Sequence, residues 1–372
     1  MASSLLIGIP QSLKYFGFSR VWESFLAESG FDLVYSGPTT KDVVDKGIEC
    51  SVSEACLPVK LIHGEVASLE GKVDRVFLPR LVNISGTTVF CPKFLGMPDM
   101  VRASLGNKVE LLSPRIDLRK GPRDVSRSFL ESVRGLGEGG MRAARTRLRD
   151  LVASLRIPQD FDAAPVAAAA TVADGTPEDG PTIGVLGYPY LVENEYASMG
   201  LVRKLAGRGV RVLKVPDVSE ADLASVSGEF DKQVFWYFSD RVVKAGYHWC
   251  RAGAVDGLIH LTAFGCGPDA IADKLLELEA RRSGLPYLTV SVDECSGEAG
   301  VVTRVEAFVD MLTRVPGGQR YGGMNHNVES DVSAYGAVSS CSHCANGGNG
   351  ERSHCAAGTD ATDAQPWHQV RP

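Results

Sequence analysis

Short apolar runs alternate with amphipathic stretches along this chain, and the alternation occurs twice. LLIGIP (5–10) and VDGLIHLTAF (255–264) are typical of buried strands, whereas FSRVWESFLAES (18–29) and AIADKLLELEARRSG (270–284) place apolar residues at helical spacing. Strands that alternate with helices form parallel sheets, because each helix crosses back over the sheet. The sequence therefore predicts an α/β fold of two lobes, each with a mostly parallel sheet flanked by helices.

Composition divides the chain into four segments. Residues 162–182 are rich in Ala, Pro, Gly and acids and poor in large apolar side chains, which is typical of a linker. From residue 315 onward Gly, Ser, Asn, His and Ala replace the branched aliphatic residues, which indicates disorder. We therefore expect an N-terminal α/β lobe over 1–161, the linker over 162–182, a C-terminal α/β lobe over 183–314 and a disordered Gly/Ser/Asn/His/Cys-rich tail over 315–372.

The charge balance and the hydropathy exclude several classes of partner. The 39 Lys and Arg residues against 45 Asp and Glu residues give a net charge of -6, without the concentrated basic surface that phosphate neutralisation requires. We expect no nucleic-acid partner. The chain also lacks an apolar run of about 18 residues, and MASSLLIGIP lacks the basic head and long apolar stretch of an export signal. These features predict a cytoplasmic protein that does not bind a membrane.

Three of the nine cysteines are followed within two residues by a proline that can open a helix. The three cysteines with their prolines are Cys56 with Pro58, Cys91 with Pro92, and Cys266 with Pro268. Proline is tolerated in the first turn of a helix, so Cys56 and Cys266 are expected at helix N-termini, where unpaired amides and the positive dipole end stabilise a thiolate. For Cys91 we expect a strand-to-helix connection whose helix begins later, near Pro98.

Open α/β sheets bind their ligands beyond the carboxyl ends of the strands, where these connections lie. Three thiolates from separate connections can converge in the crevice between the lobes and hold a 4Fe-4S cluster, which leaves one iron open to another ligand. The wide separation of the three cysteines in the sequence does not match the compact cysteine runs of ferredoxins. On the residues alone, buried unreactive cysteines and a structural zinc site therefore remain alternatives.

Several motifs resemble the 2-hydroxyacyl-CoA dehydratase superfamily. They are EACLPVK, PRLVNI followed by CPKFLGMPDMVR, HLTAFGCGPD, and GEAGVVTRVEAFVDML, in the expected order from about residue 5 to residue 313. The nearest branch is the acyl-CoA dehydratase activase-related proteins, which include relatives of the double-cubane cluster proteins. The resemblance implies an oxygen-sensitive protein of anaerobic metabolism, with Cys56, Cys91 and Cys266 as ligands of a 4Fe-4S cluster or of a larger, double-cubane iron-sulfur cluster.

The resemblance also implies a partner and a reaction. Family members receive a low-potential electron from a separate ATP-dependent iron-sulfur activator, and this chain lacks the activator's nucleotide motifs, so it would be the receiving component. In the characterised dehydratases the open iron binds the thioester carbonyl of a 2-hydroxyacyl-CoA, and a ketyl radical expels the hydroxyl group. The double-cubane relatives instead reduce small molecules.

We therefore interpret the chain as an iron-sulfur redox enzyme that reduces a small molecule or a thioester, paired with itself as a homodimer or with a related second subunit. One alternative is a subunit of a radical 2-hydroxyacyl-CoA dehydratase, which would pair with an unlike, related subunit. The other alternative is a non-catalytic protein with structural zinc.

Two positions depart from the pattern that the resemblance predicts. Tyr188 stands in GYPY where GHPY is expected, and Cys295 follows Asp293 and Glu294 where DEH is expected. Cys295 would add a thiol beside the crevice. Together with Cys50 and Cys250 it would bring the core to six thiols, enough for a larger cluster, although Cys250 also fits the core and Cys50 a loop or helix face.

Other polar residues have structural interpretations that compete with functional ones. His63 and His260 are expected in the core or next to the cysteine ligands. For His260, inside a buried strand, we expect ring nitrogens that are already hydrogen-bonded within the protein. Glu298, Arg304 and Glu306 either orient a substrate or form structural ion pairs. The tail offers a second set of potential zinc or iron ligands, which can also bind metal adventitiously. They are Cys341, His343, Cys344, His354 and Cys355.

Overall fold

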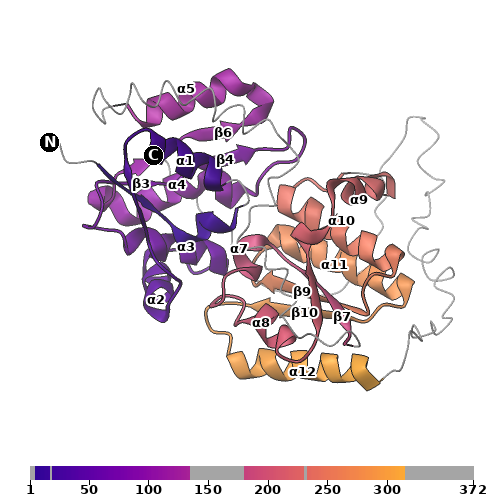
Figure 1. Ribbon diagram of the computed structural model, residues 1–372. Coiled ribbons are helices and arrows are strands. Elements are labelled where there is room, and N and C mark those ends of the chain that lie inside the picture. Colours follow the sequence, from indigo (N-terminus) through magenta and orange to yellow (C-terminus); the bar gives the residue numbers. More distant parts are fainter. Residues whose placement is uncertain (1–4, 17–18, 135–179, 230–232, 315–372) are drawn as a thin grey trace, which may run out of the picture. The chain divides into compact units, whose positions relative to one another are not determined.

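The computed structural model describes residues 5–16, 19–134, 180–229 and 233–314 (Figure 1). All of the described residues belong to one compact unit, Met1–Gly323. Most of the predicted linker and all of the predicted tail, with its cysteines and histidines, lie outside the described residues. The predicted domain boundaries therefore stay a prediction.

The first half of the chain is built on a four-stranded parallel sheet in the order β2-β1-β3-β5. Its strands are β1 (Leu6–Ile9), β2 (Asp32–Tyr35), β3 (Arg75–Phe77) and β5 (Leu111–Leu112). Its helices are η1 (Gln11–Tyr15), α1 (Ser19–Glu28), α2 (Lys41–Cys50), α3 (Leu57–Ala67), α4 (Pro92–Leu105), η2 (Gly106–Lys108), η3 (Leu118–Lys120) and α5 (Pro122–Ser132). Trp22 of α1 and Phe129 of α5 pack against Phe77 of β3, so these helices cover one face of the sheet.

Two prolines interrupt strands of this sheet. Beyond Pro79 and Pro114 the chain continues into a separate two-stranded parallel sheet, β4 (Arg80–Asn83) with β6 (Arg115–Asp117). Proline has no amide to donate to a strand ladder, so pairing breaks at these positions. It resumes where the Arg80 amide donates to the Pro114 carbonyl at 2.9 Å. The apolar run VDRVFLPRLV (73–82), which alone reads as one strand, is therefore divided into two strands.

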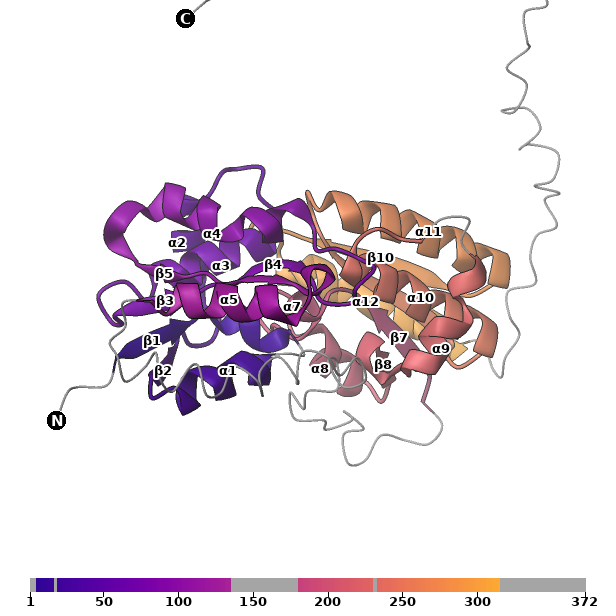
Figure 2. The same ribbon diagram turned by 90° about the horizontal axis from the view of Figure 1, so that it is seen from above.

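The second half is built on another four-stranded parallel sheet, in the order β10-β9-β7-β8 (Figure 2). Its strands are β7 (Thr182–Leu186), β8 (Arg211–Lys214), β9 (Gly257–Ala263) and β10 (Tyr287–Val292). Its helices are α7 (Pro189–Val192), α8 (Leu201–Ala206), η4 (Val215–Asp217), α9 (Glu220–Ser225), η5 (Ser227–Glu229), α10 (Tyr237–Ala252), α11 (Gly267–Ser283) and α12 (Glu298–Arg314). Trp249 of α10 packs on Gly184, while Phe308 of α12 packs on Gly257, so helices cover both faces of the sheet.

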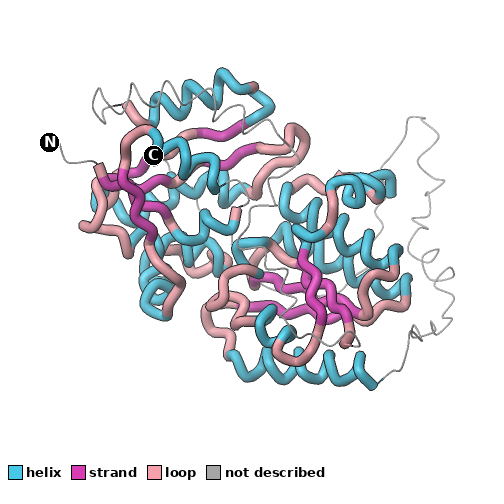
Figure 3. The backbone as a smooth tube through the Cα atoms, in the orientation of Figure 1, coloured by secondary structure: helices cyan, strands magenta, loops and turns pink. Residues whose placement is uncertain are grey.

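Both four-stranded sheets have the same strand order. Numbered within each half, the order is 2-1-3-4, with all strands parallel. Helices flank the strands in both halves (Figure 3). The chain therefore reverses direction across each sheet between its first and third strands, β1 and β3 in one half and β7 and β9 in the other. Such a reversal leaves a crevice at the carboxyl ends of those strands, where ligands bind. The predicted α/β fold class is confirmed.

None of the helices that the structure describes combines the length and the apolar character needed to cross a lipid bilayer.

Candidate functional site

Three helices begin directly after a cysteine. Cys56, Cys91 and Cys266 are the N-cap residues of α3, α4 and α11, each with extended backbone and a proline in the first turn that follows. The expected N-terminal positions of Cys56 and Cys266 are confirmed. The expectation of a later start after Cys91 is wrong, because α4 begins at Pro92 and contains Pro98. An interior proline costs a helix one hydrogen bond, but it does not set the start when another proline already occupies the first turn.

The three cysteines approach one another although they come from distant parts of the sequence. The thiols of Cys56 and Cys266 are hydrogen-bond partners, and Cys91 is close enough to Cys56 for the two sulfurs to interact electrostatically. Cys56 is buried, and the other two are half-buried. We call Cys56, Cys91 and Cys266 the three-cysteine site. Cys266 follows β9 at the carboxyl edge of the second sheet, as the sequence predicted, whereas Cys56 follows α2 and not a strand.

The surroundings favour a thiolate at this site. The hydrogen bond from Cys266 lowers the pKa of Cys56 against the effect of burial, and the Lys93 ammonium lowers it further. The same hydrogen bond, together with burial, raises the pKa of Cys266, and burial raises the pKa of Cys91. Each sulfur also faces a backbone amide of its own helix, although none of these contacts has the geometry of a regular N-cap hydrogen bond. These amides belong to Val59, Phe94 and Asp269. The helix starts thus favour negative charge on the sulfurs.

Aromatic rings enclose the three-cysteine site. Tyr188 and Tyr190, at the start of α7, are each 5% exposed, and burial raises the pKa of both hydroxyls, with the cysteines contributing. Tyr190 stacks on Phe16 at 5.5 Å between ring centroids, and Phe238 packs edge-on to Tyr190 at 5.4 Å. The Tyr188 hydroxyl pairs with Ser239 Oγ at 2.7 Å. Tyr188 therefore gives this site a buried phenol where the resemblance predicted an imidazole.

Side-chain and backbone contacts join the two halves of the described chain near these cysteines. Lys60, one turn into α3 and only 3% exposed, forms an ion pair with Glu294, which follows β10. The Asn194 side chain donates to Thr39 Oγ1 at 2.8 Å. Val89, just before Cys91, makes an isolated parallel bridge with Trp236, just before α10. These contacts hold helix starts from both halves together.

The remaining described cysteines lie apart from this group. Cys250 is buried on α10, where burial raises its pKa to about 11 and Ser283 is its hydrogen-bond partner. Cys50 ends α2 half-buried, and Cys295 is exposed in the segment after β10. The structure gives none of them an interaction with the three-cysteine site among the residues that it describes. Their recruitment into a larger cluster stays a prediction.

A buried network of charged and hydroxyl groups lies behind Cys266. His260, at the centre of β9, is fully buried, with Nδ1 at 2.8 Å from Asp273 Oδ1 and Nε2 at 3.2 Å from Asp269 Oδ1. Burial lowers the His260 pKa, but the two carboxylates outweigh it and raise the pKa to about 9. Asp273 also accepts from the Tyr287 and Thr289 hydroxyls, at 2.7 and 2.8 Å. The prediction that His260 lies in a buried strand with its ring nitrogens hydrogen-bonded is confirmed.

His63 is likewise a core residue, with Nδ1 at 2.8 Å from the Val59 carbonyl. The carboxylates near the start of α12 form ion pairs, as one of the two interpretations predicted. Glu298 pairs with Lys204 and Glu306 with Arg208, so their partners lie in or near α8. Arg304 does not join them and donates to the Thr289 carbonyl.

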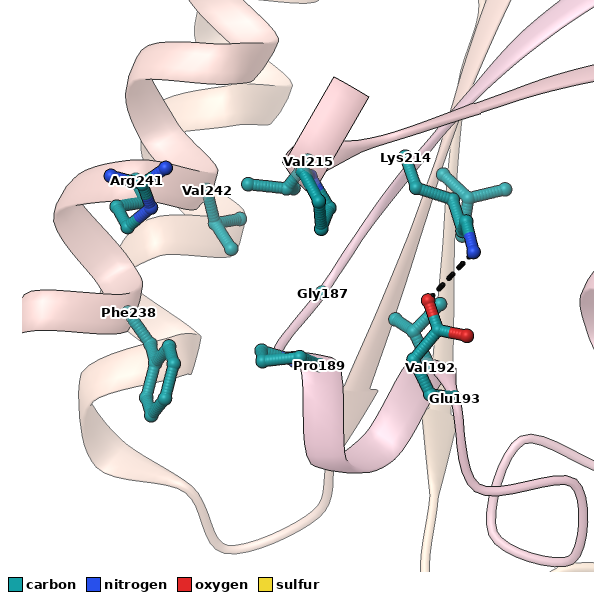
Figure 4. Close-up of a pocket in the computed structure, with 11 residues that line it drawn as sticks. Gly187, Pro189, Val192, Glu193, Lys214, Val215, Phe238, Arg241 and Val242 are labelled. Carbon is teal, nitrogen blue, oxygen red and sulfur yellow. Dashed lines mark hydrogen bonds and ion pairs between the residues drawn. The ribbon is translucent and has the colours of Figure 1, made fainter. Parts of the chain in front are cut away.

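A pocket of about 380 Å³ lies beyond the carboxyl ends of β7 and β8 (Figure 4). Apolar side chains such as Val192, Val215 and Phe238 line it, and an ion pair between Lys214 and Glu193 at 2.8 Å closes one end. Phe238 also belongs to the aromatic wall of the three-cysteine site. The pocket and the cysteines therefore share this ring, but the pocket itself contains no thiol.

The donor set of this site, three cysteine sulfurs, is chemically suited to an iron-sulfur cluster. Within the described ranges, no three His, Cys, Asp or Glu side chains are grouped closely enough to hold one ion. A cubane spreads its ligands over several irons, so its cysteines lie farther apart than the ligands of one zinc ion. The three sulfurs lie at helix starts, with amides directed at them and aromatic rings around them, which suits thiolate ligands of a cluster.

The fold and the motifs define a member of the 2-hydroxyacyl-CoA dehydratase and activase-related superfamily. Residues 6–217, more than half of the chain and with Cys56 and Cys91 among them, match the family described as CoA enzyme activase uncharacterised domain. The chain belongs to this family. Residues 239–312, which include Cys266, match the family described as 2-hydroxyglutaryl-CoA dehydratase, D-component. The resemblance inferred from the motifs is confirmed.

No curated protein matches the chain. The solved structures that match include SBP FpvC from Pseudomonas aeruginosa in complex with Ni2+ and with Mn2+. Each is 12% identical, covers 85% or 84% of this chain and 99% of its own, and has a TM-score of 0.26. That TM-score is too low to support an inference about fold or function.

Asp269 is the residue that the sequence analysis missed. A carboxylate in the first turn of a helix is ordinary, because it complements the positive end of the helix dipole. Only its complete burial next to Cys266 distinguishes it.

Proposed function

We propose that this protein is an iron-sulfur redox protein, which accepts low-potential electrons from an ATP-dependent activator and uses them to reduce a small molecule or a thioester. Cys56, Cys91 and Cys266 are the cluster ligands in this proposal. The observation that carries it is the meeting of three helix-capping cysteines, two from one half of the chain and one from the other.

The residues around the cysteines suit such a role. The Cys56 pKa is lowered, and the amides at all three helix starts act toward the thiolate, the form that binds iron, although burial outweighs them at Cys91, as the hydrogen bond with Cys56 and burial do at Cys266. The rings of Tyr188, Tyr190 and Phe238 exclude water from one side of the site. The cluster would supply one-electron transfer at low potential. The family memberships support an activator partner, because one family name refers to an activase and the other to a dehydratase component.

The second candidate is a subunit of a radical 2-hydroxyacyl-CoA dehydratase. The match of residues 239–312 to a dehydratase D-component favours it, because that segment contains both Cys266 and the buried network behind it. The two candidates differ in partner. A dehydratase subunit needs an unlike, related subunit, whereas the preferred function predicts a homodimer.

The first test measures iron, acid-labile sulfide and zinc, with visible absorption, on protein purified without oxygen. About four irons per chain with matching sulfide is the expected result, and about eight would favour a double cubane. Changing Cys56, Cys91 or Cys266 to Ala should remove iron, whereas the matched control Cys250→Ala should keep it. Zinc alone, or no metal after anaerobic reconstitution, would leave the non-catalytic alternative.

A second measurement separates the two candidates. The purified activator with ATP should reduce the cluster of this chain alone, which can be followed as bleaching of the visible absorption. Dehydration of 2-hydroxyglutaryl-CoA that depends on an added second subunit would instead favour the dehydratase.

A further inference from the structure

Asp269 places a buried carboxylate beside the three-cysteine site. It is the third residue of α11, three positions after Cys266, and it is 0% exposed. Its charge contributes to raising the pKa of Cys266, and after burial it is the largest contribution that raises the pKa of the Tyr188 hydroxyl. The carboxylate therefore lies close to both the cysteine sulfur and the aromatic wall.

Only one of the two carboxylate oxygens is used inside the protein. Asp269 Oδ1 lies 3.2 Å from His260 Nε2, whereas Oδ2 has no hydrogen-bond partner among the described residues. Burying a carboxylate oxygen without a hydrogen-bond partner costs free energy, because the oxygen loses its hydrogen bonds to water and no protein group replaces them. Such an atom in the helix turn that follows Cys266 suggests a ligand that it binds.

His260 holds this oxygen in place. Its ring is fixed from the other side by Asp273 at 2.8 Å, and Asp273 is in turn held by the Tyr287 and Thr289 hydroxyls. Because the ring cannot turn without breaking these contacts, Asp269 cannot easily exchange its two oxygens. His260 is therefore a positioning residue, and Oδ2 stays directed away from it.

We infer that Asp269 Oδ2 is the fourth protein ligand of the cluster, bound to the iron that Cys56, Cys91 and Cys266 leave without a thiolate. A carboxylate oxygen is an accepted ligand of iron in proteins. The Tyr188 hydroxyl, the other oxygen nearby, is already paired with Ser239 Oγ at 2.7 Å. This inference rests on the proposed function with a single 4Fe-4S cluster. It adds that the fourth iron has a protein ligand in the resting state.

The experiment examines what occupies the fourth iron. The wild-type protein, reconstituted without oxygen and reduced with dithionite, is placed in water enriched in oxygen-17 and studied by electron-nuclear double resonance. Bound water gives an oxygen-17 coupling, and a carboxylate from the chain gives none. We expect no coupling in the wild type and a clear coupling in Asp269→Ala, where water replaces the carboxylate.

Two further variants complete the test. Glu277→Gln is the matched control, because Glu277 is a carboxylate of the same helix α11 that pairs with Lys274 and Arg281 and takes no part in holding His260. It should behave as the wild type. Asp269→Cys should keep about four irons even if Asp269→Ala loses its cluster, because a thiolate replaces the carboxylate ligand.

An oxygen-17 coupling in the wild type would overturn the inference and leave the proposed function standing. So would loss of the cluster from a folded Asp269→Cys protein. Absence of iron from the wild type would instead overturn the proposed function itself, and the inference with it.

Discussion

The two halves of the described chain share a strand order but not a cysteine pattern. In each half the third strand leads into a helix that begins after a cysteine: β3 and its continuation β4 lead to Cys91 and α4, and β9 leads to Cys266 and α11. These two cysteines are therefore topological equivalents. The helix before the third strand differs, because the N-cap residue of α3 is Cys56 whereas that of its counterpart α10 is Trp236.

This difference explains why the site has three thiols and not four. Two equivalent strand-to-helix connections supply one cysteine each, and the first half adds a third through the tight pair of helices α2 and α3. In the second half, the start of α10 carries the aromatic side chains Tyr237 and Phe238, which pack around the three-cysteine site. Negative charge on the thiolates is thus enclosed on one side by apolar rings.

The largest expected effect comes from breaking the packing that positions Cys56. A Cβ added at Gly64 would lie 1.8 Å from the Val43 carbonyl oxygen of α2, so Gly64→Ala should force the two helices apart. We expect a loss of about 3 kcal/mol in the free energy of unfolding, measured by urea denaturation. The iron content should fall with it.

The equivalent helix of the other half gives the matched control. A Cβ at Gly246 of α10 would lie 2.2 Å from Leu276 Cδ2, which is the end of a flexible side chain and not backbone. Gly246→Ala should therefore cost only about 1 kcal/mol. Equal losses for the two variants would show that the helix pair α2 and α3 is not the more rigid packing.

The second prediction concerns the buried acid of α3. Glu65 is fully buried and accepts from the Ser12 amide at 2.9 Å and the Ser12 hydroxyl at 2.8 Å, and burial raises its pKa from 4.5 to about 7. Between these two pKa values the folded chain holds more protons than the unfolded chain. The free energy of unfolding should therefore fall as the pH rises from 4.5 to 7, by about 3 kcal/mol in total.

Urea denaturation across that pH range tests this prediction, and Glu65→Gln should flatten the profile. The buried acid of α10 is Asp240, whose pKa burial also raises, but the Lys244 ammonium at 2.7 Å opposes that rise. Asp240→Asn should therefore leave most of the slope in place. A wild-type profile that rises with pH over this range would contradict the assignment.

The third prediction weakens the connection between the halves. Glu294→Gln leaves the buried Lys60 ammonium without its carboxylate, which should cost about 2 kcal/mol, less than for a fully buried pair because Glu294 is 23% exposed. The double variant Lys60→Met with Glu294→Gln should recover much of the loss. As a control, Asp45→Asn removes the exposed pair with Lys41 and should change nothing measurable. Thermal unfolding decides between these outcomes.

The smallest effect is expected at Tyr188. Tyr188→Phe removes the hydrogen bond to Ser239 and leaves that buried hydroxyl unpaired, at a cost of about 1 kcal/mol. The double variant with Ser239→Ala should recover part of it. A denaturation midpoint that is lower in the double variant than in Tyr188→Phe would show that the hydroxyl has another role.

Local patterns were enough to predict much of this fold. The strands over 5–10 and 255–264, the parallel alternation of strands with helices and the helix starts after Cys56 and Cys266 follow from apolar periodicity and from proline in a first turn. The superfamily followed from ordered motifs. These features depend on residues that are neighbours in sequence, which is why sequence alone reveals them.

Features that depend on distant contacts were not predicted. The helices α2 and α10 escaped notice because each carries an interior glycine, Gly47 or Gly246, which lowers helix propensity and is explained only by close packing against another element. The break between β3 and β4 depends on two prolines facing each other across a strand pair. The role inferred for Asp269 depends on its burial against His260, which no spacing reveals.

The order in which the cysteines occur along the chain has a consequence for synthesis. A ribosome completes β1 to β6, with Cys56 and Cys91, long before it reaches Cys266, which is part of the second sheet. Domains generally fold as they emerge, N-terminal part first. The nascent first half therefore carries two thiols of an unfinished site. In the proposed function, a cluster held by all three cysteines would have to wait until α11 has been translated and has docked.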